Sequence, residues 1–232
     1  MNRLAGSYCG PPPIPAELMS RWNLDPFALV VLIILATWAG RSRPAVLSIS
    51  VLAFVFLSPL CALASALFAA RVGHHVLLVA IAAPLLALAR PKRMPVAVGL
   101  PFLAATATLW LWHAPVLYDA ALSNKALYWI MQGSLFGSAY LFWRAAFSQP
   151  AGSGVMWVFL AYLAMGMLGA ILTLAPYAVY ETHALAPLAW GLSPLADQQL
   201  GGLVMWMPAG LAYAVWGAML ARRAWHYMER SS

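Results

Sequence analysis

Three histidines and one aspartate carry the candidate chemistry of this sequence: His74, His75, His113 and Asp197. A neutral imidazole is a common ligand of transition metals, and a nearby carboxylate can orient its second ring nitrogen. Imidazole combined with thioether sulfur suits copper better than hard cations. The chain contains 11 Met, but Met is common in apolar cores, so this number adds little support. No CxxC, CxxxC or Met-x-x-Met motif accompanies these residues. Residue types rather than spacing therefore suggest copper.

The pair His74 and His75 opens the apolar stretch HHVLLVAIAAPLLALARP. Adjacent residues on a helix differ in direction by about 100°, so we expect one ring to face the bundle and the other the membrane interface. Arg71 and His75 are four residues apart and share a face. The alternative role of the pair is hydrogen bonding to lipid headgroups.

His113 lies in the stretch LWLWHAPVLYDAAL. Pro115 weakens the helix two residues later and frees backbone carbonyls beside the imidazole. Tyr118 and Asp119 follow at the expected membrane boundary, where either could orient a ligating ring. The tryptophans alone would form an ordinary aromatic belt, but His113 needs a further reason and is predicted to be functional.

Asp197 lies in the stretch PLADQQLGGLVMWMPAGLAY. It is predicted to cap the start of the last helix, where a carboxylate meets free N–H groups. Asp197, Gly201 and Met205 are successively four apart and form one stripe, and Gly201 with Gly202 permits close approach of another helix. A capped, tightly packed helix and the third wall of a metal site both stay open here.

The elements that position these residues are apolar helices. Of 232 residues, 64% are hydrophobic and 8% are charged, against about 25% charged in soluble domains, so the chain is predicted to be an integral membrane protein. Apolar runs at about 22–40, 44–70, 72–89, 96–122, 126–143, 154–175 and 198–220 predict an all-α polytopic bundle of about seven spans, or six if the short first run does not span. Kinks are expected at four prolines within these runs: Pro59, Pro84, Pro101 and Pro208. The expected domains are a polar outer tail (1–21), one transmembrane domain (22–222) and a cytoplasmic tail (223–232).

The distribution of basic residues predicts the orientation. One side receives Arg3, Arg21, Arg71 and Lys125, and the other receives Arg41, Arg43, Arg90, Lys92, Arg93, Arg144, Arg222, Arg223 and Arg230. Because the basic side is cytoplasmic, the N-terminus is predicted outside and the C-terminus inside. The net charge of +7 is thus assigned to loops, and nucleic acid is not an expected partner.

The four candidate residues and His183 then fall at the outer face, where His183 is expected to be a plain loop residue, with a role as a metal ligand as the alternative. Cys61 lies inside an apolar run, so we do not expect it to form a disulfide with Cys9.

Together the stretches quoted above resemble the CtaG-type family of polytopic cytochrome c oxidase assembly factors, over about residues 44 to 222. The resemblance implies a bacterial plasma (inner) membrane protein that helps copper reach a haem-copper oxidase, with the oxidase subunits and the lipid bilayer as partners. It implies metal ligands at His75 and His113, a ligand or orienting group at Asp197, and His74 as an auxiliary ligand. Many members carry a histidine where this chain has Arg71.

Two other functions stay open. A b-type haem electron-transfer protein could use His75 and His113 as axial ligands, and a metal-free scaffold would use the same residues for packing. An enzyme is not expected, because the sequence lacks a nucleophile elbow, an HExxH motif and a carboxylate pair deep in the spans. Oligomeric state is open, because the Gly201/Gly202 face could pack within the bundle or between chains.

Overall fold

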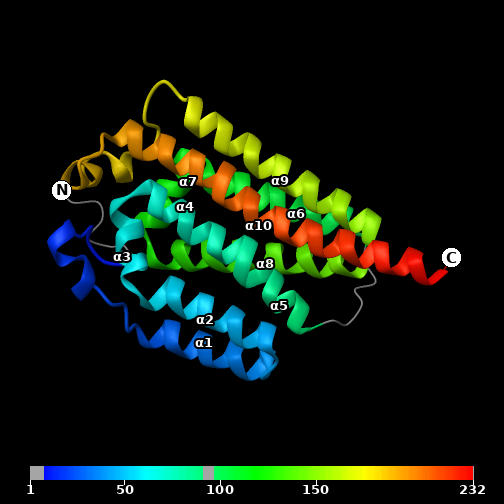
Figure 1. Cartoon of the computed structure of the whole chain (residues 1–232). Coiled ribbons are helices and arrows are strands. Elements are labelled where there is room, and N and C mark those ends of the chain that lie inside the picture. The colour runs from blue at the N-terminus through cyan, green and yellow to red at the C-terminus, as the bar shows by residue number, and fades with distance from the viewer. Residues whose placement is uncertain (1–7, 91–96, 232) are drawn as a thin grey trace.

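The computed structural model describes residues 8–90 and 97–231, and these residues contain helices and no strand. The helices are α1 (Pro26–Ala39), α2 (Arg43–Leu57), α3 (Pro59–Ala66), α4 (Phe68–Val76), α5 (Ala83–Ala89), α6 (Gly99–His113), α7 (Pro115–Ser123), α8 (Lys125–Ser148), α9 (Ala151–Leu174) and α10 (Pro194–Ser231). Shorter turns are η2 (Pro15–Ser20), the π-helical η3 (Leu77–Ala82), η4 (Glu181–His183) and η5 (Ala186–Trp190). Figure 1 shows the long helices side by side, with α9 and α10 along one flank and α1 and α2 along the other. The predicted all-α class is confirmed.

Within the described residues, three helical stretches are long and apolar enough to cross a membrane: Phe68–Ala89, Gly152–Leu174 and Pro194–His226. Two helix pairs bent at a short break, α2 with α3 and α6 with α7, raise the number to five if each pair is one span. Seven spans and the outward N-terminus therefore stay predictions. Three basic residues used for that orientation, Arg3, Lys92 and Arg93, lie outside the described residues.

The prolines act according to their position in each helix. Pro59 and Pro115 begin α3 and α7 after bends of 53° and 76°. The kink expected at Pro101 is absent because α6 begins at Gly99, so this proline lies in the first turn, where a missing N–H removes no helical hydrogen bond. Pro208 lies inside α10, which nevertheless continues to Ser231.

The π-helical turn η3 lies between the two histidines of α4 and Pro84. A π-turn and a proline leave backbone carbonyls without helical donors, and in an apolar bundle neighbouring side chains must supply the donors. Three helices do so: Trp143 Nε1 donates to the carbonyl of Val79 at 2.8 Å, Trp216 Nε1 to that of Ala80 at 2.8 Å, and Ser48 Oγ to that of Ala82 at 2.7 Å. These bonds fix the helix that carries His74 and His75 to α8, α10 and α2.

Close packing of α10 against its neighbours depends on glycine. A Cβ added at Gly169 of α9 would lie 2.8 Å from the carbonyl oxygen of Gly202, and a Cβ at Gly201 would collide with the ring of Phe68 in α4. The prediction that Gly201 and Gly202 permit close helix approach is confirmed. Both partner helices belong to the same chain.

The N-terminal segment closes one end of the bundle. It meets α3 and the segment 175–193 there (Figure 1), and Trp190 Nε1 donates to the carbonyl of Pro13 at 3.1 Å. Cys9 forms a disulfide with Cys61, with 5.3 Å between their Cα atoms. The expectation of no disulfide was wrong because the helix breaks at Ser58, which places Cys61 in the first turn of α3 at this end of the bundle.

Candidate functional site

Three of the four predicted site residues form a buried histidine cluster. His74 and His75 lie in α4 and His113 ends α6; the ring centroids are 5.7 Å apart for His74 and His75 and 5.7 Å apart for His75 and His113. The expectation that one of the adjacent rings faces the membrane interface was wrong, because both are buried. Neighbouring helices cover α4 on both sides: His74 packs against Phe56 of α2, and His75 lies against Gln132 of α8.

Hydrogen bonding determines the protonation of His113. Its Nδ1 lies 2.7 Å from the carbonyl oxygen of Leu109, which can only accept, so Nδ1 carries the proton. Nε2 then presents a lone pair, and it is buried without a hydrogen-bond partner among the described residues. A histidine that ligates a metal usually donates one ring N–H to a backbone carbonyl or carboxylate, which leaves the other ring nitrogen free to bind the ion.

His75 has a comparable arrangement. Its Nε2 lies 3.3 Å from Gln132 Nε2, and its Nδ1 has no hydrogen-bond partner. Amide nitrogen and oxygen are assigned from the hydrogen-bond network, and exchanging them lets Gln132 Oε1 accept from His75 Nε2–H. In that orientation Nδ1 of His75 carries a free lone pair, whereas with the amide as placed Gln132 Nε2–H donates to His75 Nε2 and Nδ1 carries the proton. Both ring nitrogens of His74 are likewise buried without a partner.

The cluster offers few ligands. Among residues 8–90 and 97–231, no group of three or more His, Cys, Asp or Glu side chains is arranged to hold a metal ion. A closed structural zinc site uses four ligands. His75 and His113 together offer two imidazoles, fewer ligands than such a site requires.

Asp197 lies outside the histidine cluster. Its carboxylate accepts the backbone N–H of Phe68 at 2.6 Å and that of Ala69 at 3.1 Å, at the start of α4. Six residues, or about 9 Å of helix, separate Phe68 from His74. Asp197 thus lies in the first turn of α10, but the prediction that it caps this helix was wrong: Ser193 Oγ accepts the N–H of Ala196 at the start of α10. Asp197 instead caps the neighbouring helix, which carries two of the histidines.

A second buried network covers the bend between α6 and α7. His183 is buried and not a plain loop residue: its Nδ1–H donates to the carbonyl of Ala66 at 3.2 Å, and its Nε2 accepts from Tyr118 Oη at 2.8 Å. Tyr180 Oη donates to the carbonyl of His113 at 2.9 Å, beside the cluster. Asp119 accepts two backbone N–H groups of η4. Segment 175–193 is rich in apolar and aromatic residues, and this composition is the sequence signal that could have predicted the burial of His183.

The His183 network predicts a pH dependence of stability. Burial lowers the pKa of His183 to about 3, below its usual value of 6.5. Between these values the unfolded chain binds a proton that the folded chain does not, so His183 destabilises the fold as pH falls below 6.5. We expect a loss of about 1.4 kcal/mol for each pH unit. Thermal unfolding of wild type and His183→Gln between pH 7 and pH 4.5 measures it.

The matched control for His183 is His226→Gln, because His226 is an exposed histidine of α10. The control should retain the wild-type slope and His183→Gln should reduce it. Equal slopes in all three proteins would show that His183 is not buried as a neutral ring.

Comparison with known proteins points to one family. The family model described as cytochrome c oxidase caa3 assembly factor (Caa3_CtaG) matches residues 95–226, more than half of the chain. The match includes His113 and Asp197, whereas His74 and His75 precede it, and it begins later than the expected residue 44. No curated protein and no solved structure matches the chain.

Proposed function

The chain belongs to the cytochrome c oxidase caa3 assembly factor family, and from this premise we propose that it carries copper to a haem-copper oxidase at the outer face of the bacterial plasma membrane. Copper is the cargo of this reaction. The chain supplies the site that holds the ion before transfer. Oxidase subunits are the partners that receive it.

The observation that supports copper is the pair of buried imidazole nitrogens without a hydrogen-bond partner, Nδ1 of His75 and Nε2 of His113. A buried acceptor left without a hydrogen-bond donor costs free energy, and a bound cation removes that cost. Imidazole suits copper, and the apolar surroundings do not suit hard cations that prefer oxygen ligands. His74, the neighbouring ring, is the auxiliary ligand.

The same surroundings favour release. Both ligands are neutral, and the guanidinium of Arg71 lies one helical turn before His75 in α4. A positive charge in a medium of low dielectric constant weakens the binding of a second cation. A cargo site needs affinity low enough for transfer, and this combination provides it. Asp197 contributes by fixing the start of α4 rather than by ligation.

The test is copper binding by detergent-purified protein loaded with Cu(I). Wild type should bind copper, and His113→Ala should lose it. Gln132→Leu, which removes the group that orients His75, should weaken binding by about 10-fold or more. His226→Ala, which removes an exposed histidine of α10, should bind as wild type does.

Two results would contradict the proposal. Folded wild type that stays metal-free after loading leaves the histidines as packing groups of a scaffold. A Soret band in the purified protein assigns the His75 and His113 rings to haem instead.

A further inference from the structure

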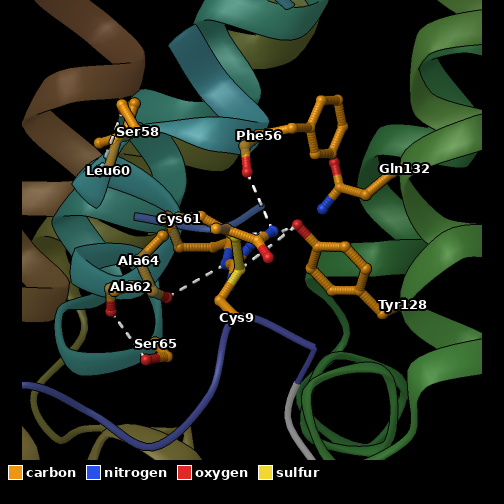
Figure 2. Close-up of a disulfide and its surroundings, with 12 residues drawn as sticks. Cys9, Phe56, Ser58, Leu60, Cys61, Ala62, Ala64, Ser65, Tyr128 and Gln132 are labelled. Carbon is orange, nitrogen blue, oxygen red and sulfur yellow. Dashed lines mark hydrogen bonds between the residues drawn. A yellow bond between two sulfur atoms is a disulfide. The ribbon is translucent and has the colours of Figure 1, made fainter. Parts of the chain in front are cut away.

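The disulfide Cys9–Cys61 lies beside a buried cation. Arg71 Nη2 lies 4.0 Å from Cys9 Sγ, and Tyr128 Oη lies 3.6 Å from the same sulfur. Arg71 Nη1 also donates to Tyr128 Oη at 3.4 Å. Figure 2 shows Cys9 entering from the N-terminal segment, Cys61 from α3, and the Tyr128 hydroxyl directed at the sulfurs from α8.

Arg71 has no anionic partner in the part of the chain that the structure describes. Its side chain is 0% exposed, and its guanidinium contacts the carbonyl of Ala64, the Tyr128 hydroxyl and the Cys9 sulfur. A buried charge is costly unless an opposite charge accompanies it. The disulfide is neutral and cannot supply that charge. Reduction creates the missing anion, because a thiolate at Cys9 would lie against both Arg71 and Tyr128 Oη.

We propose that Cys9 and Cys61 are a redox-active thiol pair, a site for thiol–disulfide exchange with a dithiol protein, in which Arg71 and Tyr128 stabilise the reduced state by holding Cys9 as a thiolate. A neighbouring cation favours the thiolate form of a cysteine, and reactive cysteines lie in such electropositive surroundings, whereas buried structural cysteines are inert. The proposal does not depend on copper. The pair nevertheless lies one helical turn from the histidine cluster, because Tyr128 and Gln132 of α8 face Arg71 and His75 of α4.

The exchange proceeds in two displacements. A thiolate of the partner attacks Cys9, which is 9% exposed against 0% for Cys61, and forms a mixed disulfide as the Cys61 thiolate leaves and takes a proton. The second thiolate of the partner then attacks the partner's first sulfur, the one that is bonded to Cys9 in the mixed disulfide. Cys9 leaves as a thiolate beside Arg71 and Tyr128. The partner dithiol loses two electrons and becomes a disulfide, the Cys9–Cys61 bond gains them, and the second proton goes to solvent.

The first experiment measures the exchange equilibrium. Metal-free, full-length protein in detergent is equilibrated with reduced and oxidised thioredoxin, and free thiols are counted by maleimide labelling. Wild type should be reduced by thioredoxin, and Arg71→Met should shift the equilibrium constant about 10-fold toward the disulfide, or about 30 mV. Arg71→Lys, which keeps the charge, should fall between the two. A folded wild type that stays oxidised would make the disulfide a structural link only. An Arg71→Met equilibrium equal to that of wild type would overturn the proposal that Arg71 stabilises the reduced state.

A second experiment keeps the inference testable if Arg71→Met does not fold. Cys61→Ser retains Cys9 alone and Cys9→Ser retains Cys61 alone, and the alkylation rate of each is followed from pH 8.5 to pH 6. The thiolate fraction of an ordinary thiol falls about 10-fold for each pH unit in this range. Cys61 should follow that dependence, whereas Cys9 should react at a nearly constant rate. A 10-fold fall per unit at Cys9 would overturn the proposal.

Discussion

Replacing Gly202 with alanine should separate α9 from α10 and lower the stability of the bundle by about 3 kcal/mol, the upper range for overpacking. The added Cβ would collide with Thr173 Oγ1 and the carbonyl oxygen of Gly169, and would lie 2.7 Å from the backbone nitrogen of Thr173. Backbone atoms cannot rotate away as a side chain can. The two helices would therefore have to move apart, and with them the contacts of α10 with α4.

The matched control is Gly217→Ala in the same helix, because a Cβ at Gly217 would meet nothing within 4 Å. Both substitutions add the same methyl group to α10, so any difference between them comes from the neighbouring helix. Thermal unfolding in detergent, followed by tryptophan fluorescence, measures the difference. Equal unfolding temperatures for Gly202→Ala and Gly217→Ala would refute the close crossing of α9 and α10.

These glycines show what local sequence can predict. Adjacent glycines in an apolar helix indicate a close approach, and the helices themselves follow from composition and hydropathy. The partner helix depends on tertiary packing, and the sequence left open whether it belonged to the same chain. Gly202 faces α9 and Gly201 faces α4, both within the bundle.

The candidate site was predictable to a similar extent. His74, His75 and His113 stand out as polar residues in apolar runs, and three-dimensional packing brings them together. The burial of both His74 and His75 was not predictable, because helical periodicity assigns directions but does not tell which directions other helices cover. The roles of His183 and Cys9 were missed because the side-chain bonds of His183 and the disulfide of Cys9 join residues that are far apart in the sequence.

Asp197→Ala should destabilise the metal-free protein by about 3 kcal/mol, because it leaves two buried N–H donors at the start of α4 unsatisfied. The carboxylate also interacts favourably with the positive end of the α4 dipole. Asp197→Asn keeps one acceptor oxygen and should recover about half of the loss. The control is Asp25→Ala, since Asp25 caps α1 through one N–H at 3.4 Å, and its loss should cost about 0.5 kcal/mol.

The stability of the metal-free protein distinguishes the two roles that the sequence left open for Asp197, ligation of copper and capping of a helix. A carboxylate that only ligates copper contributes nothing to stability before the ion binds, so Asp197→Ala would then unfold as wild type does and lose copper alone. A carboxylate that fixes α4 is needed with or without the ion, and its removal displaces His74 and His75 from His113. The hydrogen bonds to Phe68 and Ala69 predict the second result. Copper affinity should then fall together with the stability of the start of α4, and Asp197→Asn should recover about half of both losses.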